Sequence, residues 1–240
     1  MQENSLSGRF GWYGIAIFTA IMVAFFTMEA ALAHGVADDD KQFLVGAAGA
    51  NIPAFLYLGA KHMVTGYDHL LFIAGVIFFL YRFHDIAVFV SLFSLGHSIT
   101  LIVGVLSGVG IDARIVDAII GLSVIWKAFD NLSGFQTVFG VRPNLKLTVF
   151  GFGLFHGLGL AAKLQDLELS KDGLFTNLLS FNVGVELGQI LALAIILVFM
   201  NAARLSQRFV QNATAINFMI MAAGFVLVFY QLTLLALGME

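Results

Sequence analysis

The stretch from Ile86 to Ser107 reads IAVFVSLFSLGHSITLIVGVLS and contains no Asp, Glu, Lys or Arg. A helix of this length rises about 1.5 Å per residue, so it reaches across the roughly 30 Å hydrocarbon core of a bilayer while satisfying its own backbone hydrogen bonds. One ionisable side chain, His97, lies in its middle, flanked by Ser94 and Ser98. The stretch therefore predicts both a membrane-spanning helix and a polar site within it.

The rest of the chain has the composition of an integral membrane protein. Of its 240 residues, 60% are hydrophobic and only 11% are charged, whereas a soluble domain carries roughly 25% charged residues. The net charge of −3 offers no basic surface to a phosphate backbone, so we expect no nucleic-acid partner. The chain has no cysteine, so any metal must be held by histidine, carboxylate or backbone oxygen ligands.

Seven apolar segments are long enough to span a bilayer, and they predict an all-α integral membrane protein, a polytopic bundle of six or seven transmembrane helices. We expect these segments at Phe10–Met28, Val64–Tyr81, Ile86–Ser107, Ala113–Leu132, Leu147–Ala162, Leu174–Met200 and Ala215–Leu237. Residues 1–33 are either a first span or a signal peptide, because Ala31-Leu32-Ala33 has the pattern of a cleavage site. Residues 34–63 are expected to form an external loop with a short interfacial helix over 43–58, and residues 64–240 a six-helix transmembrane domain.

The distribution of charge predicts how the chain lies in the membrane. Basic residues stand nearly without acidic neighbours in the loops on one side, as in cytoplasmic loops, and they are Arg9, Arg82, Arg142, Lys146, Arg204 and Arg208. In the opposite loops the basic residues are accompanied by acidic ones, including Asp38–Asp40. We therefore expect a multi-pass protein of the bacterial inner membrane, with the acidic 34–63 loop and the C-terminus outside.

Ionisable side chains inside the predicted spans are costly in a bilayer and so indicate function. In His62-Met63-Val64-Thr65-Gly66-Tyr67-Asp68-His69, the two histidines are seven residues apart and share one helix face. The neighbouring carboxylate, Asp68, can bind a metal or orient an imidazole that does. This group indicates a cation site near the outer end of the predicted second span.

A second set of polar residues lies near the middle of the predicted spans. His97 belongs to the stretch quoted above, and His156 lies in the glycine-rich segment 151–159, where glycines allow a neighbouring helix to approach closely. The sixth span adds a carboxylate and two amides on one helix face, Asn182, Glu186 and Gln189, beside a close-packing surface formed by Gly184 and Gly188. A bound cation would compensate a carboxylate at this depth.

These residues form a predicted route for a cation. Its metal ligands are expected to be His62, Asp68, His69, His97, His156 and Glu186, with Ser94, Ser98, Asn182 and Gln189 as supporting polar groups. A cation from outside would meet the outer group before the group near the midplane. Lys127 and Asp130, near the inner end of the fourth span, are expected to be only a snorkelling pair at the interface.

Four phrases of the sequence resemble the HupE/UreJ family of hydrogenase and urease accessory proteins, a nickel-permease-like group, and its second, UreJ-like branch in particular. They are H-x5-D-H at 62–69, FSLGHS at 93–98, GLFHG at 153–157 and FNVGVELGQ at 181–189. The resemblance runs from about Lys61 to the C-terminus. It implies inward nickel transport for metalloenzyme assembly through His62, Asp68, His69 and His156. The sequence departs from the better-studied branch after His156, where no second histidine follows.

The residues alone leave the metal and the role open. Imidazole and carboxylate ligands suit Ni²⁺, Co²⁺, Cu²⁺, Zn²⁺ and Fe²⁺, and nickel leads only through the resemblance. We expect a permease and not an enzyme, without catalytic residues or a fixed cofactor. Its expected partners are the bilayer, the metal ion, and other membrane subunits or metalloenzyme maturation proteins. One alternative is a non-catalytic accessory subunit of a larger membrane complex. Another is a membrane redox protein in which His97 and His156 ligate a b-type haem.

Overall fold

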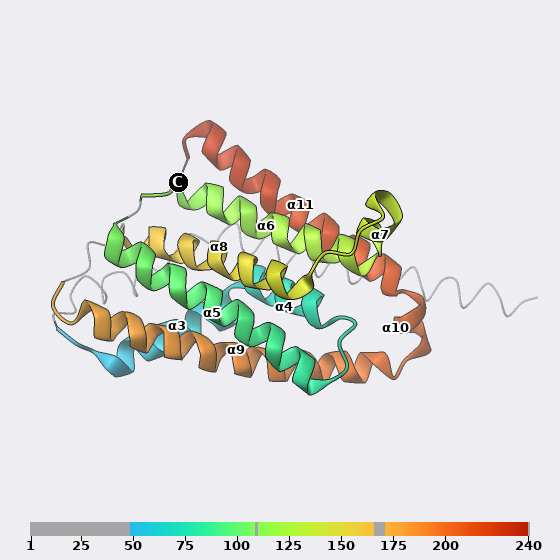
Figure 1. The fold of residues 1–240 in the computed structure, drawn as a ribbon, viewed down its shortest axis with the longest axis horizontal. Coiled ribbons are helices and arrows are strands. Elements are labelled where there is room, and N and C mark those ends of the chain that lie inside the picture. The colour runs from blue at the N-terminus through green and yellow to red at the C-terminus, as the bar shows by residue number, and fades with distance from the viewer. Residues whose placement is uncertain (1–48, 109, 166–170, 240) are drawn as a thin grey trace, which may run out of the picture. The chain divides into compact units, whose positions relative to one another are not determined.

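The computed structural model describes residues 49–108, 110–165 and 171–239 (Figure 1). Within these residues every regular element is a helix. The helices are α3 (Ile52–Thr65), α4 (Tyr67–Ile77), α5 (Phe83–Ser107), α6 (Ala113–Asn131), α7 (Gly134–Phe139), α8 (Leu145–Gln165), α9 (Leu174–Arg204), α10 (Gln207–Gln211) and α11 (Ala213–Leu237). The predicted signal peptide or first span at 1–33, and the acidic part of the predicted loop up to residue 48, lie outside the described residues.

Four of the described helices, α5, α8, α9 and α11, are long and apolar enough to cross a bilayer. Helix α6 is nearly as long, with 19 residues, but it carries more charge, from Arg114, Asp117, Lys127 and Asp130. These helices confirm the all-α class and support a membrane location. The count of six or seven spans stays a prediction.

Three close helix pairs build this part of the chain: α3 with α9, α5 with α8, and α6 with α11. In each pair, glycines lie so close to the partner helix that a β-carbon would have little or no room. They are Gly59 and Gly184 between α3 and α9, Gly96 and Gly153 between α5 and α8, and Gly121 and Gly224 between α6 and α11. Small residues allow helix backbones to approach in this way in membranes. The close-packing surface predicted at Gly184 and Gly188 is thus observed, with α3 as its partner.

The predicted second span is not one continuous helix. Helices α3 and α4 are separated by Gly66, which has an extended backbone conformation. The helix also begins much earlier than expected, at Ile52, where Pro53 suits the first turn because its missing N–H would be unpaired there anyway. The predicted boundary at Val64 is therefore wrong, because the apolar run before it continues into the helix that carries His62.

The two halves of this interrupted helix are tied to opposite ends of α9. At the start of α3, the Asn51 backbone N–H donates to Asn177 Oδ1 at 2.8 Å. At the end of α4, Arg204 Nη2 donates at 2.6, 2.9 and 3.0 Å to the carbonyl oxygens of Ile77, Phe78 and Leu80. Helices α3 and α4 therefore follow one another along α9 in the same direction (Figure 1).

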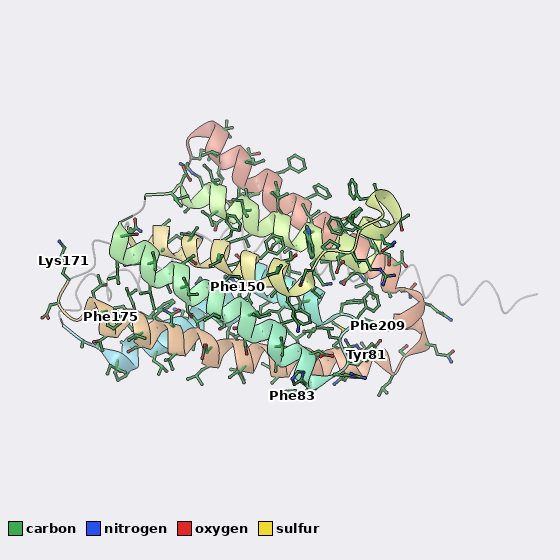
Figure 2. All side chains as sticks on the ribbon, in the orientation of Figure 1. Tyr81, Phe83, Phe150, Lys171, Phe175 and Phe209 are labelled. Carbon is green, nitrogen blue, oxygen red and sulfur yellow. The ribbon has the colours of Figure 1, made fainter. Side chains whose placement is uncertain are left out.

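We call these two ends of the bundle the Asn51 end and the Arg204 end. Figure 2 shows Lys171 and Phe175 at the Asn51 end, and Tyr81, Phe83 and Phe209 at the Arg204 end. Helices α5 and α8 both begin at the Arg204 end and run toward the Asn51 end (Figure 1). Their direction is therefore opposite to that of α3, α4 and α9.

Candidate metal site

Four histidines from four different helices meet inside the bundle: His62 of α3, His69 of α4, His97 of α5 and His156 of α8. The His69 ring is central, with its centroid 5.1 Å from that of His62, 6.2 Å from that of His97 and 4.9 Å from that of His156. Ring nitrogens of His62, His69 and His97 all lie within 4.8 Å of one another. Two nitrogens bound to one metal ion lie at most about 4.2 Å apart, so a small inward movement of the rings would complete a site.

The structure corrects the predicted depth of these histidines. We expected His62 and His69 near the outer end of a span and His97 and His156 deeper, but all four share one cluster. The reason is the position of the interruption at Gly66. Helix α3 already contributes 14 residues before this glycine, so His62 lies near the end of α3 and not at the start of a span. The prediction of two successive groups is therefore wrong, and a single histidine cluster replaces them.

The histidine cluster contains buried nitrogens that have no hydrogen-bond partner. Neither ring nitrogen of His97 has a partner within the described part of the chain, and neither has the Nε2 atom of His62, His69 or His156. Each buried polar group left unpaired costs about 1–3 kcal/mol, and such groups are few in native proteins. Several unpaired nitrogens on neighbouring rings are what a ligand set for a cation requires.

Two of the rings are oriented by hydrogen-bond acceptors at their Nδ1 atoms. His69 Nδ1–H donates to Asp68 Oδ1 at 2.8 Å, and His156 Nδ1–H donates to the carbonyl oxygen of Phe152 at 2.8 Å. Because the proton of a neutral ring is then on Nδ1, Nε2 presents a lone pair. This order of acceptor, imidazole and open nitrogen is the one that histidine metal sites use. The structure therefore places Asp68 behind His69 as an orienting carboxylate.

Close packing of α5 against α8 brings His97 and His156 to the same place. Gly157, the residue after His156, has no room for a β-carbon because the His97 carbonyl oxygen lies against it. Nearby, Thr100 Oγ1 donates to the carbonyl oxygen of Leu154 at 2.7 Å and links the two helices. A larger residue at position 157 would push the helices, and with them the two rings, apart.

The polar residues predicted on α9 are divided between the interior and the surface. Gln189 is buried and accepts a hydrogen bond from Ser94 Oγ at 2.9 Å, and Asn182 is buried as well, whereas Ser98 of α5 is half-buried. Glu186 is exposed, and the structure does not bring it to the histidine cluster. Successive helical residues turn by about 100°, so Glu186 lies some 40° from Asn182 and 60° from Gln189, just beyond the edge of the buried face.

A layer of phenylalanine rings covers the histidine cluster toward the Arg204 end. The Phe93 ring centroid lies 4.8 Å from that of His156 and 5.4 Å from that of Phe72. Phe72 lies 5.7 Å from both His156 and Phe152. These rings, which we call the phenylalanine layer, leave the histidines in contact with apolar side chains on this side.

The phenylalanine layer was not predicted from the sequence, although the sequence contains a signal for it. Each ring lies one helical turn from a histidine: Phe72 is three residues after His69, Phe93 four before His97 and Phe152 four before His156. Since α4 runs opposite to α5 and α8, these offsets place all three rings on the same side of the histidine cluster. The matching offsets, more than any single phenylalanine, were the informative feature.

On the other side of the cluster, toward the Asn51 end, the bundle contains an ion pair. Lys163 Nζ lies 2.9 Å from Asp117 Oδ2. Lys163 follows His156 by seven residues, which is two turns of α8. The cluster therefore has charged side chains on one side and aromatic rings on the other.

The second ion pair of α6 is more buried than expected. Lys127 Nζ lies 2.6 Å from Asp130 Oδ2, so the pair itself is present. However, Lys127 is only 4% exposed, because its aliphatic stem packs against Gly75 of α4. The predicted snorkelling position is therefore wrong, and Lys127 is a buried lysine paired with the half-buried carboxylate of Asp130.

A family model for HupE / UreJ proteins matches residues 38–237. The matched range includes helices α3 to α11 and all four histidines of the cluster. Comparisons with curated proteins and with solved structures gave no match. The match extends over most of the chain, and the chain therefore belongs to the HupE/UreJ family.

Proposed function

We propose that this protein is a membrane permease for a divalent transition metal ion, and that it carries nickel inward for metalloenzyme assembly. The observation that carries the proposal is the set of buried, unpartnered imidazole nitrogens contributed by four helices. Neutral imidazoles suit such ions, and Asp68 would strengthen the binding of His69 and offset part of the cation's charge. Membership in the HupE/UreJ family supports a role in metal transport or in an accessory step of metalloenzyme assembly.

The interrupted helix supports transport over permanent storage of the metal. His62 and His69 lie on different sides of Gly66, so a change in backbone angle at this residue would alter the ligand set. Transporters commonly build substrate sites on interrupted helices near the middle of the bilayer. We therefore propose that α3 and α4 together form one crossing and α6 another. With the four long apolar helices, this gives six crossings within residues 49–239.

We further propose that the Arg204 end faces the cytoplasm. Exposed basic residues lie at this end, Arg82 and Arg142 in the connections and Lys146 in the first turn of α8, and cytoplasmic loops carry such an excess. The histidine cluster then receives its ion from the side of the Asp117–Lys163 pair. An ion gradient or the membrane potential would supply the energy, and we assign no enzymatic reaction to the chain.

One observation favours the alternative, a non-catalytic accessory subunit of a larger membrane complex. Glu186 is exposed midway along α9, one of the helices that can cross a bilayer. A carboxylate facing lipid at this depth is costly. A neighbouring subunit that covers Glu186 would remove this cost.

The first experiment measures metal bound to the detergent-purified protein by elemental mass spectrometry, after exposure to a mixture of Ni, Co, Cu, Zn and Fe. Wild type should retain one of these metals selectively, and His69→Ala should lose it. The control is Phe225→Ala, which truncates an exposed ring on α11 and should retain the metal like wild type. Equal absence of metal from all three proteins would contradict the proposed site.

Uptake of the retained metal into proteoliposomes then distinguishes the two roles. A permease moves the ion across the vesicle membrane. Retention without uptake, together with stable co-purification of other subunits, would favour the accessory role.

A further inference from the structure

The Asp117–Lys163 ion pair holds an ammonium group close to the histidine cluster. Lys163 Nζ donates to Asp117 Oδ1 at 3.1 Å and lies 2.9 Å from Asp117 Oδ2, so one ammonium contacts both carboxylate oxygens. The same Oδ1 atom lies 3.6 Å from the position that a β-carbon on Gly159 would occupy. Gly159 is three residues after His156 and four before Lys163. The lysine side chain therefore extends back along α8 by about one turn toward the cluster, as helical side chains lean toward the N-terminus of their helix.

Asp68 brings a third charge to this end of the cluster. It precedes His69 in the first turn of α4, and its charge interacts with those of Lys163 and Asp117. Within the described residues, Asp68 accepts hydrogen bonds only from His69, and both bonds use Oδ1. The three charged side chains are half-buried. Two carboxylates and one ammonium leave one net negative charge beside the histidines.

A cation that approaches from this side meets a carboxylate that already has a cationic partner. Asp117 can bind the cation only if Lys163 leaves. Coulomb attraction is proportional to the product of two charges, so at equal distance a divalent ion attracts the carboxylate about twice as strongly as an ammonium or a potassium ion does. The ammonium belongs to the same chain and donates a charge-assisted hydrogen bond, so a free monovalent ion has no advantage over it. A divalent ion can therefore displace Lys163, and a monovalent ion cannot.

We propose that Asp117 is the first ligand of the entering ion and that Lys163 excludes monovalent cations from this carboxylate. The inference rests on the proposed permease function and on entry from the Asn51 end. The ligand is a divalent cation, which displaces the ammonium from Asp117 and then passes to the histidine cluster. The ammonium returns to Asp117 once the ion has moved on.

The test measures the rate of Ni²⁺ uptake by the full-length protein in proteoliposomes, in KCl and in N-methylglucamine chloride at the same ionic strength. The organic cation screens charges as K⁺ does, but it is too large to enter between packed helices. Wild type should take up Ni²⁺ at the same rate in both salts. Lys163→Met keeps an unbranched side chain of similar length and removes the charge. In this variant K⁺ should compete for Asp117 and lower the uptake rate several-fold in KCl alone.

Two further variants separate the effect of charge from that of structure. Asp117→Asn leaves the ammonium without its carboxylate, and uptake should fall about tenfold in both salts because the ammonium repels the entering ion. The double variant Asp117→Asn with Lys163→Met removes both charges, so uptake should recover part of this loss and be the same in both salts. The matched control is Lys127→Met, in the other Lys–Asp pair of α6, which should create no difference between the two salts.

The outcomes separate this inference from the proposed function. Equal uptake by Lys163→Met in the two salts would overturn the exclusion of monovalent cations and leave the permease intact. Loss of Ni²⁺ retention by purified Lys163→Met, or equally low uptake in Asp117→Asn and in the double variant, would give the pair a structural role and would also overturn it. Wild-type protein that retains Ni²⁺ but moves none into vesicles would refute the permease itself, and this inference with it.

Discussion

The α5–α8 pair and the α6–α11 pair are both closed by glycines, but their buried polar side chains differ in one respect. In the α6–α11 pair, Asn131 Nδ2 donates to Asn217 Oδ1 at 2.9 Å, and Ser123 Oγ donates to the Ile120 carbonyl at 2.6 Å. In the α5–α8 pair, the ring nitrogens of His97 and the Nε2 atom of His156 have no partner in the described chain. Paired polar groups hold helices together, whereas unpaired groups that face one another indicate a ligand.

The largest effect is expected from His97→Ala. The variant should abolish Ni²⁺ retention and uptake without lowering expression, because no hydrogen bond is lost with the ring. Elemental mass spectrometry and the proteoliposome assay measure both quantities. The matched control from the other pair is Asn217→Ala, which should lower thermal stability, since Asn131 loses a partner, and should keep Ni²⁺ retention. If His97→Ala lost stability and Asn217→Ala lost Ni²⁺ retention, the assigned roles of the two helix pairs would be contradicted.

A smaller effect is expected at the carboxylate behind His69. Asp68→Asn keeps the shape of the side chain but removes its charge, and losing such an orienting carboxylate typically lowers metal affinity about 10–100-fold. Titration of the purified protein with Ni²⁺ measures the change in Kd. The equivalent change in the other region, Asp130→Asn, should leave the Kd as it is in wild type. An unchanged Kd in Asp68→Asn would mean that the hydrogen bond to His69 does not tune the site.

Lys127→Ala should affect stability and leave transport largely intact. Removing the lysine leaves the half-buried carboxylate of Asp130 without its ion-pair partner, which should lower the free energy of unfolding by about 1 kcal/mol. The lysine belongs to α6, away from the unpaired nitrogens of the cluster. Thermal unfolding in detergent, compared with Ni²⁺ uptake on the same preparation, measures the two effects separately. A large loss of uptake at unchanged stability would place this ion pair on the route of the metal.

The smallest effect is expected from Glu186→Gln. The side chain is exposed outside the histidine cluster, so Ni²⁺ retention should equal that of wild type. If retention is lost, Glu186 joins the ligand set in another conformation of the protein, as its position in the sequence suggested. Loss of co-purifying subunits in this variant would instead support the accessory role.

The sequence was sufficient for the all-α class and for selecting the four histidines that the structure brings together, because charge-free runs and isolated imidazoles are visible without any contacts. It was not sufficient for the depth of His62. Gly66 lies within a run whose helical periodicity continues across it, and a lone glycine in a helix is usually tolerated. The position of Glu186 was missed for a different reason. Glu186 lies only about 40° around the helix axis from Asn182, which is too small a difference to assign the two residues to different faces from the sequence. The packing of α3 on α9 defines where the buried face ends.

The interruption at Gly66 brings the ends of two helix dipoles to the histidine cluster. A helix carries about half a positive elementary charge at its N-terminus and half a negative one at its C-terminus, so the cluster receives the negative pole of α3 and the positive pole of α4. Asp68 lies in the first turn of α4, and its Oδ1 accepts from the His69 backbone N–H at 2.9 Å as well as from the ring. The carboxylate therefore cancels the pole that would repel a cation. The pole of α3 remains, and it attracts a cation to a cluster whose rings carry no negative charge.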